Sequence, residues 1–278
     1  MANNIALFKN YVPMLDEVYK VASLTSVLDG AADLVRQGVN ANELVIPKMN
    51  MDGLADYSRN GGYVDGSVEL THETVKCNFD RGRMFSVDSM DNAETAGIAY
   101  GRLASEFIRT KVVPELDAFR FAQYASIPGI SSATGSLSNT TVVTALREAC
   151  TKMDEDEVPV EERYLFITPT LGGLIDDLDT NKSRAILTRF AKVIHVPQTR
   201  FFTAINQIEG GFNNAGNEIN FMIVHKPAVI QFQKHVAPKV ITPEQNPNAD
   251  AWKFGYRAVG IAEAYENKAA GIYVHHKA

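Results

Sequence analysis

Hydrophobic and polar positions change their period along the chain, and residues 91–126 show the clearest helical period. Apolar side chains recur there every three or four residues and make one continuous stripe. Asp91 followed by Glu94 has the spacing of a capping box, which predicts the start of a helix. Pro114 lacks a backbone N–H group and predicts an interruption of the same helix. The stripe consists of Ala96, Ala99, Tyr100, Leu103, Ala104, Phe107 and Ile108.

Residues 43–88 predict β-structure with a long polar excursion. The excursion is rich in Gly, Asp and Asn, and Asn60-Gly61 within it is the strongest short hairpin signal in the chain. A long two-stranded projection with few apolar residues is ordered only if it lies on another surface. The predicted segments are a strand at 43–47, the excursion at 51–66, an extended segment at 67–79, a turn at 80–82, and a strand at 83–87 that pairs back onto it.

The flanking regions predict an N-terminal arm and a mixed C-terminal half. Residues 1–40 contain one weakly amphipathic stretch that ends at Asp29-Gly30 and needs an apolar partner in the main body or in a neighbouring subunit. In the second half helices and strands alternate, which favours a small mixed or parallel sheet. The predicted elements are a loop at 127–139, a helix at 142–153, strands at 163–167, 192–196 and 218–225, a helix that opens at Thr168-Pro169, a helix at 227–235, a strand at 251–265, and a turn at 266–268 after which 271–275 pairs back as a terminal hairpin.

Composition and charge narrow the class of protein. The chain has 278 residues, 45% hydrophobic and 22% charged, which is typical of a globular protein and excludes wholesale disorder and fibrous folds. A formal net charge of −6 argues against tight wrapping of nucleic acid, which needs a basic face. Cys77 and Cys150 are too few for a disulfide framework and are expected to be free thiols in a reducing compartment. We see no signal peptide and no apolar run long enough to span a membrane, so we expect a protein used in a cytoplasm or in a particle assembled there.

No group of residues predicts a catalytic, cofactor or metal site. Ser131 lies in a near match to the G-x-S-x-G nucleophile motif, but a helix rather than a strand precedes it, which favours a flexible linker. His72 and Cys77 do not have a common metal-ligand spacing. The acidic run 154–157 lacks the glycine of a calcium loop and indicates a solvated helix end. A cytosolic α/β hydrolase that uses Ser131 is the alternative from another class.

Several segments, taken in their order along the chain, resemble the HK97-like major capsid proteins of tailed bacteriophages. Residues 111–122 resemble the long spine helix of that family, and residues 224–228 resemble the strand that leads into its closing segment. Tyr256-Arg257, residues 266–268 and residues 271–273 resemble its C-terminal strands. The resemblance implies an α+β fold with an N-terminal arm, an extended β-hairpin called the E-loop, a long spine helix, and peripheral and axial domains.

The resemblance also assigns each part of the chain to a part of that fold. The implied assignments are 1–40 for the N-terminal arm, 41–90 for the E-loop and its flanking strands, 91–126 for the spine helix of the peripheral domain, 127–224 for the axial domain, and 225–278 for the return to the peripheral domain with a C-terminal β-hairpin. Candidate subunit-interface residues in the E-loop are Tyr57, Arg59, Asn60, Gly61, Gly62 and Tyr63. Candidate hinges, chosen for their backbone chemistry, are Pro114, Gly129 and Gly135.

The function implied by the resemblance is structural rather than enzymatic. The chain would assemble as pentamers and hexamers into an icosahedral shell around a phage genome, through large obligate interfaces and without a cofactor. Implied partners are further copies of the chain, a separate scaffolding protein, a portal and a decoration protein, with the DNA enclosed without sequence-specific binding and no membrane. The implied location is the virion, after assembly in the cytoplasm of the host bacterium. The alternative within the same fold is an encapsulin, the shell protein of a bacterial nanocompartment.

Overall fold

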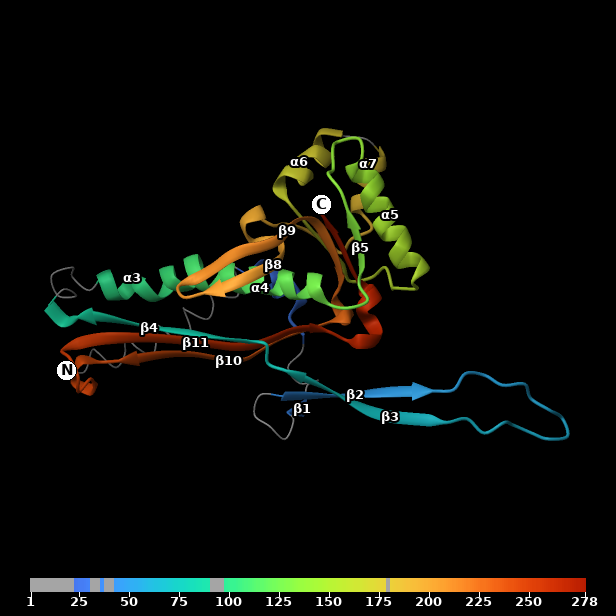
Figure 1. The fold of residues 1–278 in the computed structure, drawn as a ribbon, viewed down its shortest axis with the longest axis horizontal. Helices are drawn as coiled ribbons and strands as arrows, with labels where there is room; N and C mark the ends of the chain where they lie inside the picture. The colour runs from blue at the N-terminus through green and yellow to red at the C-terminus, as the bar shows by residue number, and fades with distance from the viewer. Residues whose placement is uncertain (1–22, 31–35, 38–42, 91–97, 179–180) are drawn as a thin grey trace.

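The computed structural model describes residues 23–30, 36–37, 43–90, 98–178 and 181–278, which form three β-sheets and a long helical rod (Figure 1). The first sheet contains β1 (Arg36–Gln37), β2 (Glu43–Met51) and β3 (Val68–Lys76). The second sheet contains, in spatial order, β10 (Val229–Ile241), β11 (Ala251–Ala264) and β4 (Phe79–Asp88). The third sheet contains, in spatial order, β5 (Ser131–Thr134), β12 (Ile272–His276), β9 (Gly211–His225), β6 (Arg163–Ile167) and β7 (Lys192–His195), with β8 (Phe202–Ile208) paired to β9.

The helical rod lies along the second sheet (Figure 1). It consists of α3 (Ile98–Phe107), a π-helix η3 (Ile108–Val112) and α4 (Val113–Ser126). The predicted helix is therefore confirmed over residues 98–126, and its expected start at Asp91 lies outside the described residues. Pro114 occupies the first turn of α4, where a missing N–H group is tolerated, and the π-helix directly before it changes the hydrogen-bonding register. At the predicted interruption the helix therefore widens into a π-helical turn before Pro114, and the helical rod continues beyond it.

α4 is buried between strands of two different sheets. Phe121 is fully buried and packs edge-to-face on Phe166 of β6, with ring centroids 5.2 Å apart, and on Phe201, with centroids 4.9 Å apart. Phe119 contacts Phe79 of β4 at a centroid distance of 5.0 Å. Aromatic pairs of this kind add stability beyond the area they bury. The centre of the core is therefore the place where one helix joins the second and third sheets.

Three helices cover one face of the third sheet (Figure 1). They are α5 (Val142–Glu155), α6 (Pro169–Leu178) and α7 (Asn181–Leu187). Leu146 and Met153 of α5 and Ile175 of α6 pack against Leu165 and Phe221 of the sheet. The sheet is mixed, because β6 is parallel to β7 and β5 to β12, whereas β9 is antiparallel to both of its neighbours β6 and β12. The predicted helix at 142–153, the strand at 163–167 and the mixed sheet are confirmed.

The prediction that residues 83–87 pair back onto the projection was wrong. β4 runs through residues 80–82 without a turn and pairs with β11, while β3 pairs with β2. Gly82, which suggested the turn, instead allows two strands to lie close together. A Cβ atom at Gly82 would lie 2.8 Å from the carbonyl oxygen of Tyr256 on β11. The local sequence does not reveal this neighbour, which is remote along the chain.

Two further predictions in the C-terminal half were wrong, and one was incomplete. Residues 227–235 are not a helix: a short 3₁₀-helix, η5 (Lys226–Ala228), leads directly into β10. β12 does not pair back onto β11 as a hairpin but joins β9 and β5 in the third sheet. The connection before it is the 3₁₀-helix η7 (Glu266–Gly271), which is longer than the hairpin loops of about two to five residues and carries the chain to another sheet. The predicted loop at 127–139 contains the short strand β5.

The described end of the N-terminal region is held on α4 by a buried polar cluster. The 3₁₀-helix η1 (Leu24–Leu28) begins beside Asp117, whose carboxylate is fully buried. Asp117 accepts hydrogen bonds from the hydroxyls of Ser23 at 2.8 Å and Thr25 at 2.7 Å, and from the backbone N–H of Leu24 at 3.1 Å. Arg120 donates to the Thr25 hydroxyl at 2.7 Å. This segment therefore finds its partner in the main body; residues 1–22, 31–35 and 38–40 of the predicted arm lie outside the described residues.

Candidate functional site

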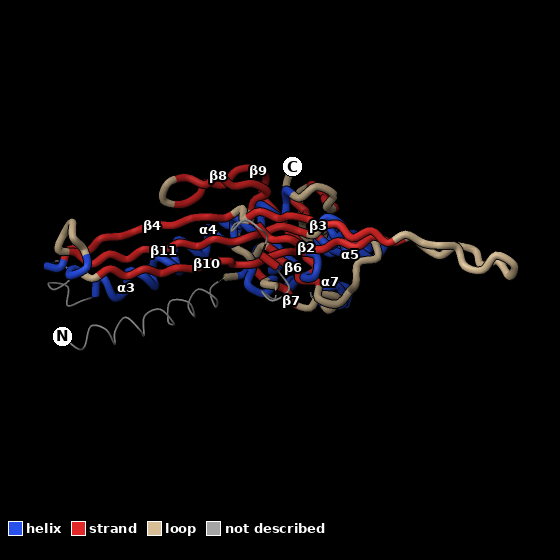
Figure 2. Tube along the Cα trace, turned by 90° about the horizontal axis from the view of Figure 1, so that it is seen from below, coloured by secondary structure: helices blue, strands red, loops and turns tan. Residues whose placement is uncertain are grey.

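β2 and β3 form a two-stranded projection that extends away from the body of the molecule (Figures 1 and 2). The strands pair antiparallel over their whole length, and residues 52–67 continue outward from them as a loop. Lys48 of β2 anchors the projection to the body, because its Nζ lies 2.6 Å from Glu266 Oε2 in η7. The predicted projection is confirmed, with β2 as the partner of β3.

The tip of the projection is a defined turn. Ser58 N donates to Gly62 O at 3.3 Å, Gly62 N donates to Ser58 O at 2.8 Å, and Gly61 N donates to Ser58 Oγ at 3.2 Å. Gly62 has a φ of 77°, which favours glycine. The rings of Tyr57 and Tyr63 meet beside the turn at a centroid distance of 4.9 Å. The structure thus brings together all six candidate interface residues, Tyr57, Arg59, Asn60, Gly61, Gly62 and Tyr63, and their interface role stays a prediction.

The projection exposes apolar side chains that the described part of the chain does not cover. Met49 is opposite Leu70 in the strand register and Met51 is opposite Val68, so these side chains form cross-strand pairs. Tyr63 is 88% exposed. Large apolar patches on a protein surface mark contacts with other molecules. The exposed apolar residues of the projection are Met49, Met51, Leu54, Tyr57, Tyr63, Val64, Val68 and Leu70.

The three candidate hinges lie in different surroundings. Pro114 follows the π-helix at the start of α4. Gly129 follows the end of α4 and has a φ of 84°, a conformation that favours glycine. Gly135 is held at the end of β5, where its N–H donates to His276 O at 2.9 Å and its carbonyl accepts from Asn220 Nδ2 at 2.9 Å. Bending at these positions stays a prediction.

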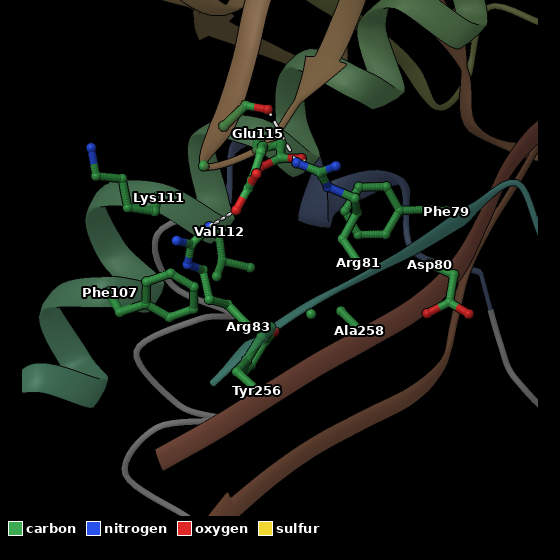
Figure 3. Close-up of a pocket in the computed structure, with 14 residues that line it drawn as sticks. Phe79, Asp80, Arg81, Arg83, Phe107, Lys111, Val112, Glu115, Tyr256 and Ala258 are labelled. Atoms are coloured by element: carbon green, nitrogen blue, oxygen red, sulfur yellow. Dashed lines mark hydrogen bonds and ion pairs between the residues drawn. The ribbon is translucent and has the colours of Figure 1, made fainter. Parts of the chain in front are cut away.

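A cavity of about 270 Å³ lies where the β8–β9 hairpin crosses the rod (Figure 3). Arg81 of β4 closes one side of this cavity, because its Nε lies 2.8 Å from Glu115 Oε1 on α4. The same guanidinium donates to the carbonyl oxygens of Ile208 at 2.7 Å and Gly211 at 3.1 Å. Burial raises the pKa of Glu115 above its ordinary 4.5, and the positive charge of Arg81 opposes this shift. Arg81 therefore joins β4, α4 and the hairpin, a role that sequence reasoning missed because it placed this residue in a turn.

A second ion-pair cluster involves Asp154 of the acidic run 154–157, which lies at the exposed end of α5. Asp154 lies 2.8 Å from Nη1 of Arg163 and 2.5 Å from Nη2 of Arg189. Arg163 is 1% exposed, so its charge needs a partner inside the protein. Burial alone would raise the pKa of Asp154, but the two arginines lower it overall. Sequence reasoning missed the two arginine partners of Asp154, because they are too distant in sequence to suggest the pairing.

The residues considered for chemistry lie apart from one another. Ser131 begins the edge strand β5 opposite Tyr273, not in a turn between a strand and a helix. Within the described ranges, no hydrogen bond joins Ser131 to a histidine or a carboxylate. Cys77 and Cys150 form no disulfide among the described residues, and no group of His, Cys, Asp and Glu there could hold a metal ion. No helix within the described residues is both long and apolar enough to cross a membrane.

Comparison with known proteins identifies the fold. No protein-family model and no curated protein matches the chain. The capsid structure of the cyanophage P-SCSP1u matches with a TM-score of 0.59 and 12% identity over 87% of this chain and 85% of that chain. The mature capsid of bacteriophage PhiM1 matches with a TM-score of 0.58 and 14% identity over 85% and 82% of the two chains. A virus-like particle from Pyrococcus furiosus matches with a TM-score of 0.58 and 11% identity over 93% and 98%.

These matches extend over most of both chains at low sequence identity, so they report the fold. The mixed helix and strand architecture is common to the chain and these structures at that level. The resemblance to HK97-like capsid proteins is therefore confirmed for the fold: the chain has the fold of phage capsid subunits.

Proposed function

We propose that the chain is a major capsid protein, which assembles as pentamers and hexamers into an icosahedral shell around a phage genome. The observation that carries the proposal is the fold shared with phage capsids over more than four-fifths of both chains. The exposed apolar residues of the projection support it, because they need a surface outside their own subunit. In this role the chain has no active site, and its contacts with other copies are its function.

The parts of the chain take the following roles in the proposal. The β2–β3 projection is the E-loop, which lies across an adjacent subunit, and α3, η3 and α4 are the spine helix. The strands of the third sheet other than β12, together with α5, α6 and α7, form most of the axial domain, within residues 127–224. Residues 225–278 return to the peripheral domain, although β12 joins the third sheet instead of forming a terminal hairpin. Pro114, Gly129 and Gly135 are the proposed hinges between subunit conformations.

The proposed location is the virion, after assembly in the host cytoplasm. Further copies of the chain are the main partners, and a separate scaffolding protein, a portal and a decoration protein are the other proposed partners. The net charge of −6 suits a shell that encloses DNA without sequence-specific binding, because like charges keep the shell from adhering to the genome.

Electron microscopy and size-exclusion chromatography of the purified chain test the proposal. We expect closed shells, or rings of five and six subunits, either alone or with a scaffolding protein added. A chain that stays monomeric or dimeric at high concentration under both conditions would contradict a shell function.

An encapsulin-type nanocompartment is the second candidate, because the match to the Pyrococcus furiosus virus-like particle covers 93% of this chain and 98% of that one. Mass spectrometry and nucleic-acid analysis of shells purified from the native source separate the two functions. Packaged DNA supports the capsid, and a packaged enzyme supports the compartment. Loss of a measurable hydrolase activity in Ser131→Ala would instead support the enzyme alternative.

A further inference from the structure

A second cavity, of about 500 Å³, lies between the loop after α5, the end of β9 and η7. Four carboxylate side chains line it, and Lys268 supplies an ammonium group. The acidic residues are Asp156, Glu157, Glu161 and Glu162. The cavity therefore has an excess of negative charge, which favours a cationic ligand.

Most of this charge is not neutralised within the subunit. Asp156 pairs with Lys152 at 2.7 Å. Glu157, Glu161 and Glu162 are exposed and have no ion-pair partner among the residues that the structure describes. The ammonium group of Lys268 donates to the carbonyl oxygen of Pro227, another residue of the lining, at 3.2 Å and lies 4.9 Å from the ring centroid of Tyr265; within the described residues it forms no ion pair with these carboxylates.

His225 is the second, independent sign of a ligand. This residue lines the cavity and is only 8% exposed, yet its ring nitrogens have no hydrogen-bond partner within the described ranges. Burial and then the charge of Arg163 lower the pKa of His225; Lys268 acts in the same direction, whereas Glu161 and Glu162 oppose it. A neutral imidazole offers one hydrogen-bond acceptor. Three free carboxylates beside one neutral acceptor suit a guanidinium, which carries a positive charge and several N–H donors.

The position of the cavity indicates where this guanidinium comes from. Asn267 and Lys268 line the cavity, and the preceding residue, Glu266, pairs with Lys48 of β2, so the cavity lies beside the base of the projection. At the other end of the projection, the tip presents Arg59, the only lysine or arginine between residues 49 and 75. Arg59 is exposed and has no ion pair among the described residues. The projection points away from its own subunit, so the tip of one copy is free to reach another (Figures 1 and 2).

We propose that Arg59 of one copy enters the acidic cavity of the next copy, beside the base of that copy's own projection. The inference rests on the proposed shell function and names the partner surface of the tip. A contact from tip to base joins two different surfaces, and such a head-to-tail interface generates closed rings when its rotation closes. The contact thus couples each projection to the next around a pentamer or hexamer.

Charge reversal with rescue tests the contact. Arg59→Glu, and separately Glu161→Lys with Glu162→Lys, should each lower the fraction of chain in rings and shells by roughly tenfold, because each places like charges across the interface. All three substitutions together should restore most of the assembly. The matched control is Arg147→Glu, which makes the same charge change at an exposed residue of α5 and should alter assembly less than about twofold. Circular dichroism melting of each variant checks that the subunit is folded.

A disulfide trap gives a readout independent of assembly yield. Arg59→Cys with Glu161→Cys should form linked dimers and larger multimers on a non-reducing gel after mild oxidation, whereas Arg59→Cys with Arg147→Cys should not. An unmodified chain that forms no rings or shells would overturn the shell function and this contact together. Shells that form equally well from Arg59→Glu, or a triple variant that fails to recover while remaining folded, would overturn the contact alone.

Discussion

α4 and the β2–β3 projection show opposite ways of stabilising a segment of chain. Ten side chains of α4 are buried, including the charged Glu115, Asp117 and Arg120, and each of these three has a partner within the subunit. On the projection, apolar side chains such as Met51 and Tyr63 are exposed. The contacts of α4 are thus satisfied within one copy of the chain, whereas the projection has a defined backbone and an uncovered apolar surface. The body is therefore stabilised by folding, and we propose that association with another copy covers the projection.

Truncation of one aromatic residue in each region should separate the two modes most strongly. Phe121→Ala removes a fully buried ring and its contacts with Phe166 and Phe201, so we expect the free energy of unfolding to fall by about 3–5 kcal/mol. Tyr63→Ala should change it by less than about 0.5 kcal/mol, because this ring is exposed, but should reduce assembly. Urea unfolding of the unassembled chain measures the first effect, and electron microscopy the second. A large loss of subunit stability in Tyr63→Ala would break the distinction.

The sequence predicted the position of both regions but not the pairing of their strands. The apolar stripe before Pro114 and the turn signal Asn60-Gly61 are local patterns, and they located the rod and the projection correctly. Strand pairing is not local. β4 pairs with a strand more than 160 residues later in the chain, and η7 carries β12 into a different sheet from β11. These partners depend on tertiary packing, which the alternation of residues within one strand does not encode.

The tip of the projection could be predicted because its turn residues form a recognisable sequence pattern. Glycine and asparagine marked the tip, and the tip residues lie together. The buried polar residues were missed, because their partners come from remote segments: Asp117 binds residues that precede it by more than 90 positions, and Arg81 reaches carbonyl groups more than 120 positions later. A charged residue in an amphipathic helix is ordinarily solvated, so the helical pattern gave no sign that Asp117 is buried.

Removal of the Asp117 carboxylate tests whether the body depends on this internal pairing. Asp117→Ala leaves the hydroxyls of Ser23 and Thr25 without their buried acceptor and Arg200 without its carboxylate partner at 3.4 Å, so we expect a loss of about 3 kcal/mol in the free energy of unfolding. Asp65→Ala on the projection is the control and should cost less than about 0.5 kcal/mol. Urea titration of both variants measures the difference. Equal stability of the two variants would mean that the buried cluster contributes nothing beyond surface charge.

Two glycines, Gly82 in the body and Gly53 on the projection, differ in how closely other backbone packs against them. A Cβ atom at Gly82 would lie 2.8 Å from the carbonyl oxygen of Tyr256, and backbone must move to relieve the clash, so Gly82→Ala should destabilise the subunit by about 1–3 kcal/mol. Gly53 on the projection has no heavy atom within 4 Å of the same position, so Gly53→Ala should leave stability nearly unchanged. Thermal melting of the two variants gives the contrast. A melting temperature for Gly82→Ala equal to that of the unmodified chain would show that the β4–β11 pair accommodates the added methyl group without loss of stability.

The smallest effect concerns the pH dependence of the body. His275 is buried against Phe221, and its Nδ1 lies 2.9 Å from the Asn220 amide, which can donate only to an unprotonated ring. Burial, with the neighbouring His276 as a second cause, lowers the pKa of His275 below its ordinary 6.5. The unfolded chain therefore binds this proton first, and stability should decrease as the pH falls through 6.5 towards the lower folded value. His275→Gln should flatten this part of the curve of unfolding free energy against pH. An identical slope in the unmodified chain and in His275→Gln would show that protonation of His275 does not change the stability of the body.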